Sequence, residues 1–260
     1  MRLDKQVAIV TGGGQGIGRQ IALHLGQEGA MVVIADINEK GSHETAEMMA
    51  KEGSKKAKVI PTDIRYENQV ERLIKGTLDI NGRIDILVNN SGIAGPVKNV
   101  EDITVEEWQD TMGVNVLGMF LCCKHVMPTM KRQEKGSIVN ISSITGKRHL
   151  VQRLPYASSK MAVIGLTRTL AFEVGKWKIR VNAICPGGII GPRLDFVIAG
   201  IMKGSGKARD QVLAELTESA ALRSLVDAKF IAATVAFLCS EDAAMITGQD
   251  INVDGGIVMY

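Results

Sequence analysis

Aromatic side chains, cysteines and prolines are scarce in this chain of 260 residues, and neither sign of charge is in clear excess. Aromatics make up 4% of the residues against 45% hydrophobic residues overall, which predicts an aliphatic core and argues against disorder. Lys and Arg number 31 and Asp and Glu 28, and this net charge of +3 is too small for the dense basic face that nucleic acid requires. No apolar run approaches the roughly 20 residues of a membrane span. We therefore expect neither nucleic acid nor a membrane as a partner.

The few cysteines also indicate a compartment. Their positions show no CxxC spacing and no regular framework, so we expect reduced thiols that act as small buried hydrophobes. Residues 1–6 lead directly into an expected strand and lack the basic start and apolar run of a secretory signal. We expect a cytoplasmic protein. The four cysteines are Cys122, Cys123, Cys185 and Cys239.

Short aliphatic runs alternate with longer amphipathic segments, which predicts a parallel sheet with helices on both faces. The chain has no Pro- or Ser-rich linker and no internal repeat, so we expect one domain over residues 1–260. Its fold class is α/β, a doubly wound parallel sheet. The expected strands are Val7 to Thr11, Met31 to Asp36, Lys58 to Asp63, Ile84 to Asn89, Gly136 to Ser142, Ile179 to Cys185 and Asp250 to Val253.

Helices are expected between these strands, for example over Gly16 to Glu28 and Val70 to Ile80. The segments Thr104 to Met130 and Tyr156 to Gly175 each have room for two helices. The least regular region runs from 186 to about 216 and contains six glycines and two prolines. Long irregular stretches in compact domains are usually binding loops, so this region is expected to be a lid over the substrate.

A glycine-rich segment, Thr11 to Gly18, follows the first expected strand and opens the first expected helix. Its spacing is GxxxGxG rather than the strict GxGxxG fingerprint. Glycines let the backbone turn sharply and approach a pyrophosphate, and the helix N-terminus offers free N–H groups to the anion. A glycine-rich turn without a ligand is the alternative for such a run taken alone.

Asp36 favours the dinucleotide interpretation, because it ends the second expected strand 18 positions after Gly18. A carboxylate there can accept hydrogen bonds from both ribose hydroxyls and would repel a 2′-phosphate. No Arg or Lys stands at Gln15 or at 37–38 to bind that phosphate. The sequence therefore favours NAD over NADP.

Tyr156 and Lys160 are spaced i and i+4 and so lie on one face of a helix. A free phenol has a pKa of about 10 and is a poor base near neutral pH. An adjacent ammonium in a partly desolvated cleft, together with a positive nicotinamide ring, stabilises the phenolate. By itself the pair is common, so its meaning depends on the rest of the chain.

With these motifs in place, the sequence resembles the short-chain dehydrogenase/reductase family over almost its entire length. The resemblance implies a Rossmann-type form of the doubly wound sheet. The matching residues are Thr11 to Gly18, Asn89-Asn90-Ser91-Gly92, Asn115, Ser142-Ser143, Tyr156, Lys160 and Pro186-Gly187.

The resemblance implies a catalytic set of four residues. Tyr156 would exchange a proton with the oxygen of a secondary alcohol or ketone, and Ser143 would hydrogen-bond the same oxygen. Ser143 is preferred to Ser142 because its separation from Tyr156, 156 − 143 = 13, is the one familiar in this family. Lys160 would hold the nicotinamide ribose and lower the pKa of the phenol, and Asn115 would anchor a water in a proton relay.

The resemblance also implies how NAD is held. Asp63 would contact the adenine, and Asn89 would fix the central strand beside the cofactor. Where the family usually has a Thr that contacts the nicotinamide amide, this chain has Gly191, so that contact would come from backbone such as that of Ile189. The implied cofactor-binding residues are Gly12, Gln15, Gly16, Ile17, Gly18, Asp36, Asp63, Ile64, Asn90, Tyr156, Lys160, Pro186, Gly187 and Ile189.

Neither a metal nor a single subunit is expected. Hydride transfer coupled to proton transfer onto a phenolate requires no metal, and the four histidines form no i, i+4 pair with an acid between them. Members of the family are usually tetramers that pair two helices, here Thr104 to Met130 and Tyr156 to Gly175. We therefore expect a homotetramer.

The segment between Ser143 and Tyr156 is usually apolar in the family but here carries Lys147, Arg148, His149 and Arg153, and Arg193 lies in the expected lid. Arginine's planar fork suits carboxylate, phosphate or sulfonate groups. We infer a small-molecule substrate, such as a polyol, sugar or hydroxy acid, whose anionic group contacts Arg153, with Arg148 or Arg193 as a further contact. Solvated loop charges or a subunit contact are the alternative interpretation.

Two other functions remain open at this point. One is reduction of a 3-oxoacyl thioester on a carrier protein. The surface residues Lys131 and Arg132 would bind the carrier protein, but Asp36 argues against this function because such reductases prefer NADPH and Asp36 favours NAD. The other is a catalytically silent dinucleotide-binding protein. The presence of Ser143, Tyr156 and Lys160 argues against it, because a silent protein does not need a proton-transfer set.

Overall fold

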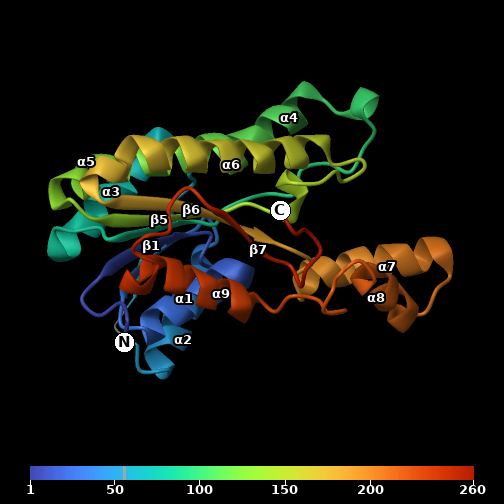
Figure 1. The fold of residues 1–260 in the computed structure, drawn as a ribbon, viewed down its shortest axis with the longest axis horizontal. Helices are drawn as coiled ribbons and strands as arrows, with labels where there is room; N and C mark the ends of the chain where they lie inside the picture. Colours follow the sequence, from blue (N-terminus) through green and yellow to red (C-terminus); the bar gives the residue numbers. More distant parts are fainter. Residues whose placement is uncertain (55–56) are drawn as a thin grey trace.

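Seven parallel strands form one sheet in the order β3-β2-β1-β4-β5-β6-β7 in the computed structural model (Figure 1). The structure describes residues 1–54 and 57–260, except for the side chains of residues 192, 193, 196, 197, 200, 201 and 204. The predicted doubly wound parallel sheet is confirmed. The strands are β1 (Val7–Thr11), β2 (Met31–Ala35), β3 (Lys58–Val59), β4 (Ile86–Asn89), β5 (Gly136–Ile141), β6 (Ile179–Pro186) and β7 (Asp250–Val253).

Helices cover both faces of the sheet (Figure 1). On one face lie α1 (Gly16–Gln27), α2 (Glu39–Lys51) and α9 (Ala228–Cys239), and α1 packs directly on α9. On the other face lie α3 (Glu67–Asn81), α5 (Met119–Gln133) and α6 (Leu154–Val174). The remaining helices are α4 (Val105–Met112), α7 (Pro192–Ser205) and α8 (Arg209–Thr217).

The central strands are largely apolar because most of their side chains meet one of two helical layers. In β1, Ala8 and Val10 pack in the core beneath α1 and α9, whereas Ile9 between them packs in the core beneath α3 and α5. All three are fully buried. Burial of an aliphatic side chain of this size stabilises the fold by about 1.5–3 kcal/mol, so the sheet is held from both faces.

Local signals in the sequence set the helix boundaries on the α3–α6 face. Thr104 caps α4: its Oγ1 accepts the Glu107 N–H at 3.2 Å, and the Glu107 carboxylate accepts the Thr104 N–H at 3.0 Å. This reciprocal pair satisfies two N–H groups that the helix cannot use. The helix α3 ends at Gly82, which has a φ of +67°, a left-handed conformation that glycine adopts readily.

Several expected boundaries were wrong. The regular third strand ends at Val59 rather than Asp63, although the N–H groups of Ile60 and Thr62 still donate to the carbonyls of Ile34 and Asp36. The segment Tyr156 to Gly175 holds one continuous helix, α6, followed by a single 3₁₀ turn over Gly175–Trp177. Thr104 to Met130 does hold two helices, α4 and α5, which a π-helical segment over Gly113–Gly118 joins without a break.

The region from 186 to about 216 is more regular than expected. It contains α7 and α8, which pack on each other and project from one side of the sheet (Figure 1). One proline and one glycine mark the boundaries of a helix rather than a long loop, since Pro192 begins α7 and Gly206, with a φ of +71°, ends it. The prediction of an irregular segment was therefore wrong in its secondary structure.

Two further expectations concern the state of the cysteines and the presence of membrane-spanning helices. All four cysteines are free and buried, as expected, and burial raises the pKa of Cys123 and of Cys239 to about 12. Within residues 1–54 and 57–260, no helix combines the length and the apolar character needed to cross a bilayer.

A buried ion pair joins the last strand to the segment that follows β5. The Lys147 ammonium lies 2.7 Å from the Asp250 carboxylate and donates to the Tyr260 carbonyl at 2.7 Å. Arg168 of α6 contacts the same carboxylate at 2.6 Å. The side chains of Lys147 and Asp250 are 7% and 10% exposed. Burial acts to raise the pKa of Asp250, but hydrogen bonds from Lys147 and Arg168 outweigh it and hold that pKa below its usual value.

We expect Asp250→Asn to lower the free energy of unfolding at pH 7 by about 2–3 kcal/mol, because it leaves the Lys147 ammonium buried without its carboxylate. The folded-state pKa of Asp250 is depressed, so its contribution is present above the unfolded pKa near 4 and is lost as the pH falls through the lower folded value. Urea unfolding between pH 7 and pH 3 measures the difference from wild type.

The matched control is Glu215→Gln, which removes an exposed ion pair with Lys207 and should cost less than about 1 kcal/mol. A difference between wild type and Asp250→Asn that stays constant over this pH range would contradict the assignment.

Candidate active site

The glycine-rich loop after β1 brings the chain back on itself at the start of α1. Gly12 has a φ of +65°, and its N–H donates to the Ala35 carbonyl of β2 at 2.7 Å. A Cβ atom on Gly18 would lie 2.0 Å from the Gly12 carbonyl oxygen. Only glycine fits at this contact, so the loop and the helix can pack closely enough to form a cradle.

The N-terminus of α1 is open to a ligand. Gln15 and Gly16 are exposed there and Ile17 is half-buried. The first turn, Gly16 to Arg19, contains no acidic residue, so the free N–H groups and the positive end of the helix dipole face outward without a competing carboxylate. The three expected contacts therefore lie where an anionic pyrophosphate would bind.

Thr11 and Asn90 join the ends of β1 and β4. The buried Thr11 hydroxyl accepts the N–H groups of Asn90 and Ser91, both at 3.0 Å. The Asn90 side chain donates back to the carbonyls of Thr11 and Gly12, also at 3.0 Å. These bonds fix the loop at the point where the sheet order reverses, which is the usual position of a ligand in such sheets.

Asp36 follows β2, at the edge of the same loop. Its carboxylate accepts the Gly14 N–H and the Asn38 N–H, both at 2.9 Å. The charge is therefore held in place by backbone alone, next to the residues that would bind a pyrophosphate.

Asp63 lies after β3 with a partner that the sequence analysis did not identify. Both of its carboxylate oxygens accept hydrogen bonds from the Arg65 guanidinium, between 2.7 and 3.1 Å. These bonds from Arg65 lower the pKa of Asp63. Arg65 also binds Asp110 of α4 at 2.7 Å, so Arg65 links the expected adenine contact to α4. Ile64 beside it is buried.

Asn115 is fully buried in the π-helical segment, a feature often found at functional sites. Its side chain accepts the Ile93 N–H at 2.8 Å and donates to the Ile93 carbonyl at 3.0 Å. It also donates to the Ser159 hydroxyl at 3.0 Å, and Ser159 in turn donates to the Tyr156 carbonyl at 2.7 Å. Asn115 thus holds the loop after β4 against α6.

Lys160 is 5% exposed on α6, and its ammonium donates to the Ile141 carbonyl at the end of β5, at 2.9 Å. Its ammonium nitrogen lies 5.6 Å from the centre of the Tyr156 ring. A Cβ atom on Gly92 would lie 3.5 Å from the Lys160 ammonium and 3.2 Å from Asn115 Oδ1. The structure therefore brings Lys160, Tyr156 and Asn115 to one place, with Gly92 leaving room beside them.

The two serines after β5 have different surroundings. Ser142 donates to the Lys160 carbonyl at 2.8 Å and so is committed to packing. Ser143 is 9% exposed, and its hydroxyl oxygen accepts the Thr145 N–H at 3.1 Å. The hydroxyl proton of Ser143 is thus not required by that bond, which suits the preference for Ser143 over Ser142.

The residues at the end of β6 and just after it contact β7 and the segment before α9. Gly187 donates its N–H to the Val253 carbonyl at 3.0 Å, and a Cβ on it would lie 2.9 Å from Asp254. Pro186 is the last residue of β6, and Ile189 forms a backbone bridge with Val226. Gly191 precedes α7.

The basic residues between Ser143 and Tyr156 separate in space. Lys147 turns to Asp250, as described above. Arg148 is exposed. Arg153 lies beside Tyr156, its guanidinium carbon 5.2 Å from the ring centre, and donates to the Ala94 carbonyl at 2.7 Å. The side chain of Arg193 lies outside the described residues.

Sequence reasoning missed Ser159 and Arg65. Ser159 connects Asn115 to the backbone of Tyr156, and the only signal for it was a serine three residues after that tyrosine. Arg65 lies two positions from Asp63, but its second partner, Asp110, lies 45 positions away and could not be located from the sequence. Asn89 was expected to fix the central strand, and it donates to Asn140 on β5 at 2.9 Å.

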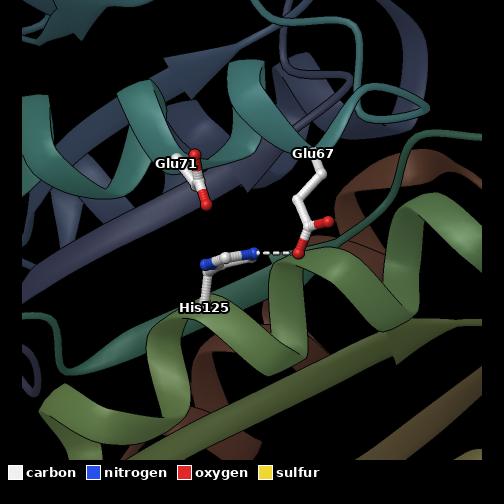
Figure 2. Close-up of side chains that lie close together, drawn as sticks. All are labelled: Glu67, Glu71 and His125. Atoms are coloured by element: carbon white, nitrogen blue, oxygen red, sulfur yellow. Dashed lines mark hydrogen bonds and ion pairs between the residues drawn. The ribbon is translucent and has the colours of Figure 1, made fainter.

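One further group of metal-type donors lies between α3 and α5 (Figure 2). Donor atoms of Glu67, Glu71 and His125 lie within 4.8 Å of one another. Lys124 donates to Glu67 at 2.6 Å and His125 contacts it at 2.8 Å, and these contacts lower the pKa of Glu67. Because a cation already occupies the carboxylate, we interpret the group as ion pairs that join the two helices.

Comparison with known proteins gives one consistent family. The family model described as enoyl-(acyl carrier protein) reductase matches residues 12–258. A 3-oxoacyl-[acyl-carrier-protein] reductase of Staphylococcus epidermidis is 36% identical over 255 residues, which cover 97% of this chain and 98% of that protein.

Two solved structures share the fold over nearly the whole chain. Xylitol dehydrogenase bound to NAD⁺ has a TM-score of 0.92 at 30% identity, covering 98% of this chain and 100% of that one. A variant actinorhodin polyketide ketoreductase with NADPH has a TM-score of 0.92 at 32% identity, covering 98% of each chain. The conclusion from the sheet, the glycine loop and these relatives is that the chain belongs to the short-chain dehydrogenase/reductase family of oxidoreductases.

Proposed function

We propose that the protein is an NAD(H)-dependent oxidoreductase that interconverts a secondary alcohol and a ketone. The observation that supports the proposal is that Lys160 lies 5.6 Å from the centre of the Tyr156 ring and next to Asn115 and Gly92. Ser143, the glycine loop and Asp36 follow the same ends of β5, β1 and β2. When bound, the nicotinamide ring supplies the acceptor or donor of the hydride.

The residues present fit a dinucleotide. The contact between Gly18 and Gly12 leaves no room for a side chain, and the first turn of α1 offers N–H groups to a pyrophosphate. Asp36, held by two backbone N–H groups, would bind the ribose hydroxyls, and Asp63 with Ile64 would contact the adenine. Gln15, Ile17, Asn90, Pro186, Gly187 and Ile189 would line the remaining path to Lys160.

In the oxidation direction Tyr156 acts as the base. Its phenolate oxygen takes the hydroxyl proton as the carbon–oxygen double bond forms and the hydride leaves with its electron pair, and in reduction the phenol returns that proton. Ser143 donates a hydrogen bond to the same substrate oxygen. Lys160 favours the phenolate through its charge and would bind the nicotinamide ribose.

Asn115 supports the proton path from a fixed position. Both of its side-chain groups are engaged by Ile93, and its amide also reaches Ser159. We assign it to holding the loop after β4 beside Lys160, where a relay water would be anchored.

The substrate proposed is a polyol, sugar or hydroxy acid with an anionic group that contacts Arg148, Arg153 or Arg193. Support is strongest for Arg153, whose guanidinium lies beside Tyr156. α7 and α8 would close over this substrate as a lid. Reduction of a 3-oxoacyl thioester is a second candidate, supported by the S. epidermidis reductase at 36% identity.

We also propose a homotetramer in the cytoplasm. Apolar side chains stand exposed on the helices expected to pair, for example Leu117 at 47% and Phe120 at 48%. Phe120, Met127 and Leu170 line an apolar groove between α5 and α6. A second copy of the chain would cover this face, as exposed patches of this kind usually mark interfaces.

Tyr156→Phe is expected to lower NAD-dependent turnover by about 10³-fold, within the range for loss of a general acid–base group, while NAD⁺ binding stays within about threefold. Absorbance at 340 nm with a panel of secondary alcohols and ketones measures turnover, and calorimetry measures binding. Tyr66→Phe, an exposed tyrosine, is the control that should keep wild-type rates. Retention of full activity by Tyr156→Phe would overturn the proposal.

Cofactor choice is tested by direct binding. We expect the wild type to bind NAD⁺ at least about tenfold more tightly than NADP⁺, because the Asp36 carboxylate repels a 2′-phosphate. Asp36→Ala should weaken NAD⁺ binding and reduce the difference in affinity between NAD⁺ and NADP⁺. The control Asp79→Ala, which removes an exposed acid on α3, should leave both affinities unchanged. Tighter binding of NADP⁺ by the wild type would refute the assignment.

A further inference from the structure

The ring of Tyr156 lies beside two cations rather than one. Lys160 is the expected partner, 5.6 Å from the ring centre. The guanidinium carbon of Arg153 is closer, at 5.2 Å. Arg153 immediately precedes α6, and Tyr156 and Lys160 follow it by three and seven positions. Tyr156 and Lys160 therefore lie on one face of α6, and Arg153 lies just before the first turn of that helix.

Arg153 is fixed by contacts other than a substrate. Its guanidinium donates to the Ala94 carbonyl at 2.7 Å, and Ala94 follows Ile93, whose backbone the buried Asn115 holds on both sides. The side chain is half-buried. A guanidinium keeps its charge across the working pH range, so a permanent positive charge is built into the surroundings of the phenol.

We propose that Arg153 is a positioning residue that, together with Lys160, favours the ionised form of Tyr156 and orients its ring. This inference rests on the proposed role of Tyr156 as the acid–base group. An opposite charge within about 4–6 Å stabilises the charged form of a titratable group. Both cations lie beside the ring, 5.2 and 5.6 Å from its centre, so together they supply more of that stabilisation than the single lysine.

The charges on neighbouring elements do not cancel this effect. On α4, which packs on α6, Glu107 is paired with Lys98 and Asp110 with Arg65. Lys147, in the turn after Ser143, is paired with Asp250. Asn115 of the π-helical segment is neutral. Other charged residues on elements that pack against α6 include Glu106 on α4, Lys124 on α5, Arg180 on β6 and Lys176 after α6.

Two simpler roles for Arg153 make different predictions. If Arg153 served only to hold the loop through Ala94, any hydrogen-bond donor of suitable length would replace it. If it served only to bind an anionic substrate, its loss would change KM and leave the ionisation of the Tyr156 phenol unchanged. The effect of the Arg153 charge is therefore distinguished from the effect of its hydrogen bond by two variants. Arg153→Gln keeps a hydrogen-bond donor but no charge, and Arg153→Lys keeps the charge.

The test is a titration of the phenol itself. The chain has three tyrosines, so the difference in absorbance near 295 nm between each protein and its Tyr156→Phe counterpart isolates the ionisation of Tyr156. We expect Arg153→Gln to raise the midpoint by about one pH unit, which is about tenfold less phenolate at a given pH. Arg153→Lys should stay close to wild type, and Lys160→Met should raise the midpoint as a positive control.

Each outcome decides the inference. A higher midpoint in Arg153→Gln with a wild-type midpoint in Arg153→Lys supports it. An unchanged midpoint in Arg153→Gln overturns it, whatever the turnover. Because the measurement needs no substrate, an enzyme inactive on every alcohol tested would count against the proposed function alone. Circular dichroism confirms folding, and Arg153→Met provides a second uncharged variant if Arg153→Gln does not fold.

Discussion

The buried ammonium of Lys160 is the constraint on which the site depends. A buried charge is costly unless it is hydrogen-bonded, and this one donates to the Ile141 carbonyl at 2.9 Å. That bond ties α6 to the end of β5. Tyr156, one turn earlier on α6, and Ser143, two residues beyond Ile141, are thereby brought to the same edge of the sheet.

A second constraint holds the cofactor half of the site. Thr11 and Asn90 exchange hydrogen bonds between the ends of β1 and β4, and Gly18 packs against Gly12 where no side chain fits. Asn115 extends the same rigid unit to α6 through Ser159. The residues proposed for proton transfer and the proposed dinucleotide cradle are thus linked through one set of hydrogen bonds.

The sequence predicted the parallel sheet and the position of the glycine-rich loop because their signals are local. Uniformly apolar runs located the strands, and the glycine spacing located the cradle. What it could not predict depends on contacts between distant segments. Lys147 is one of the charges in the segment expected to border the substrate, but the fold pairs it with Asp250, 103 positions away. The continuity of α6 and the regularity of α7 and α8 were also missed, since glycines that end a helix resemble those of a loop.

The central claim is that the nicotinamide end of a bound dinucleotide meets α6. A crystal structure of the NAD⁺ complex tests it most directly. We predict the pyrophosphate against Gly12 to Gly18 and the nicotinamide ribose within hydrogen-bond distance of the Lys160 ammonium. A dinucleotide bound with its nicotinamide ribose away from Lys160 and Tyr156 would contradict the account.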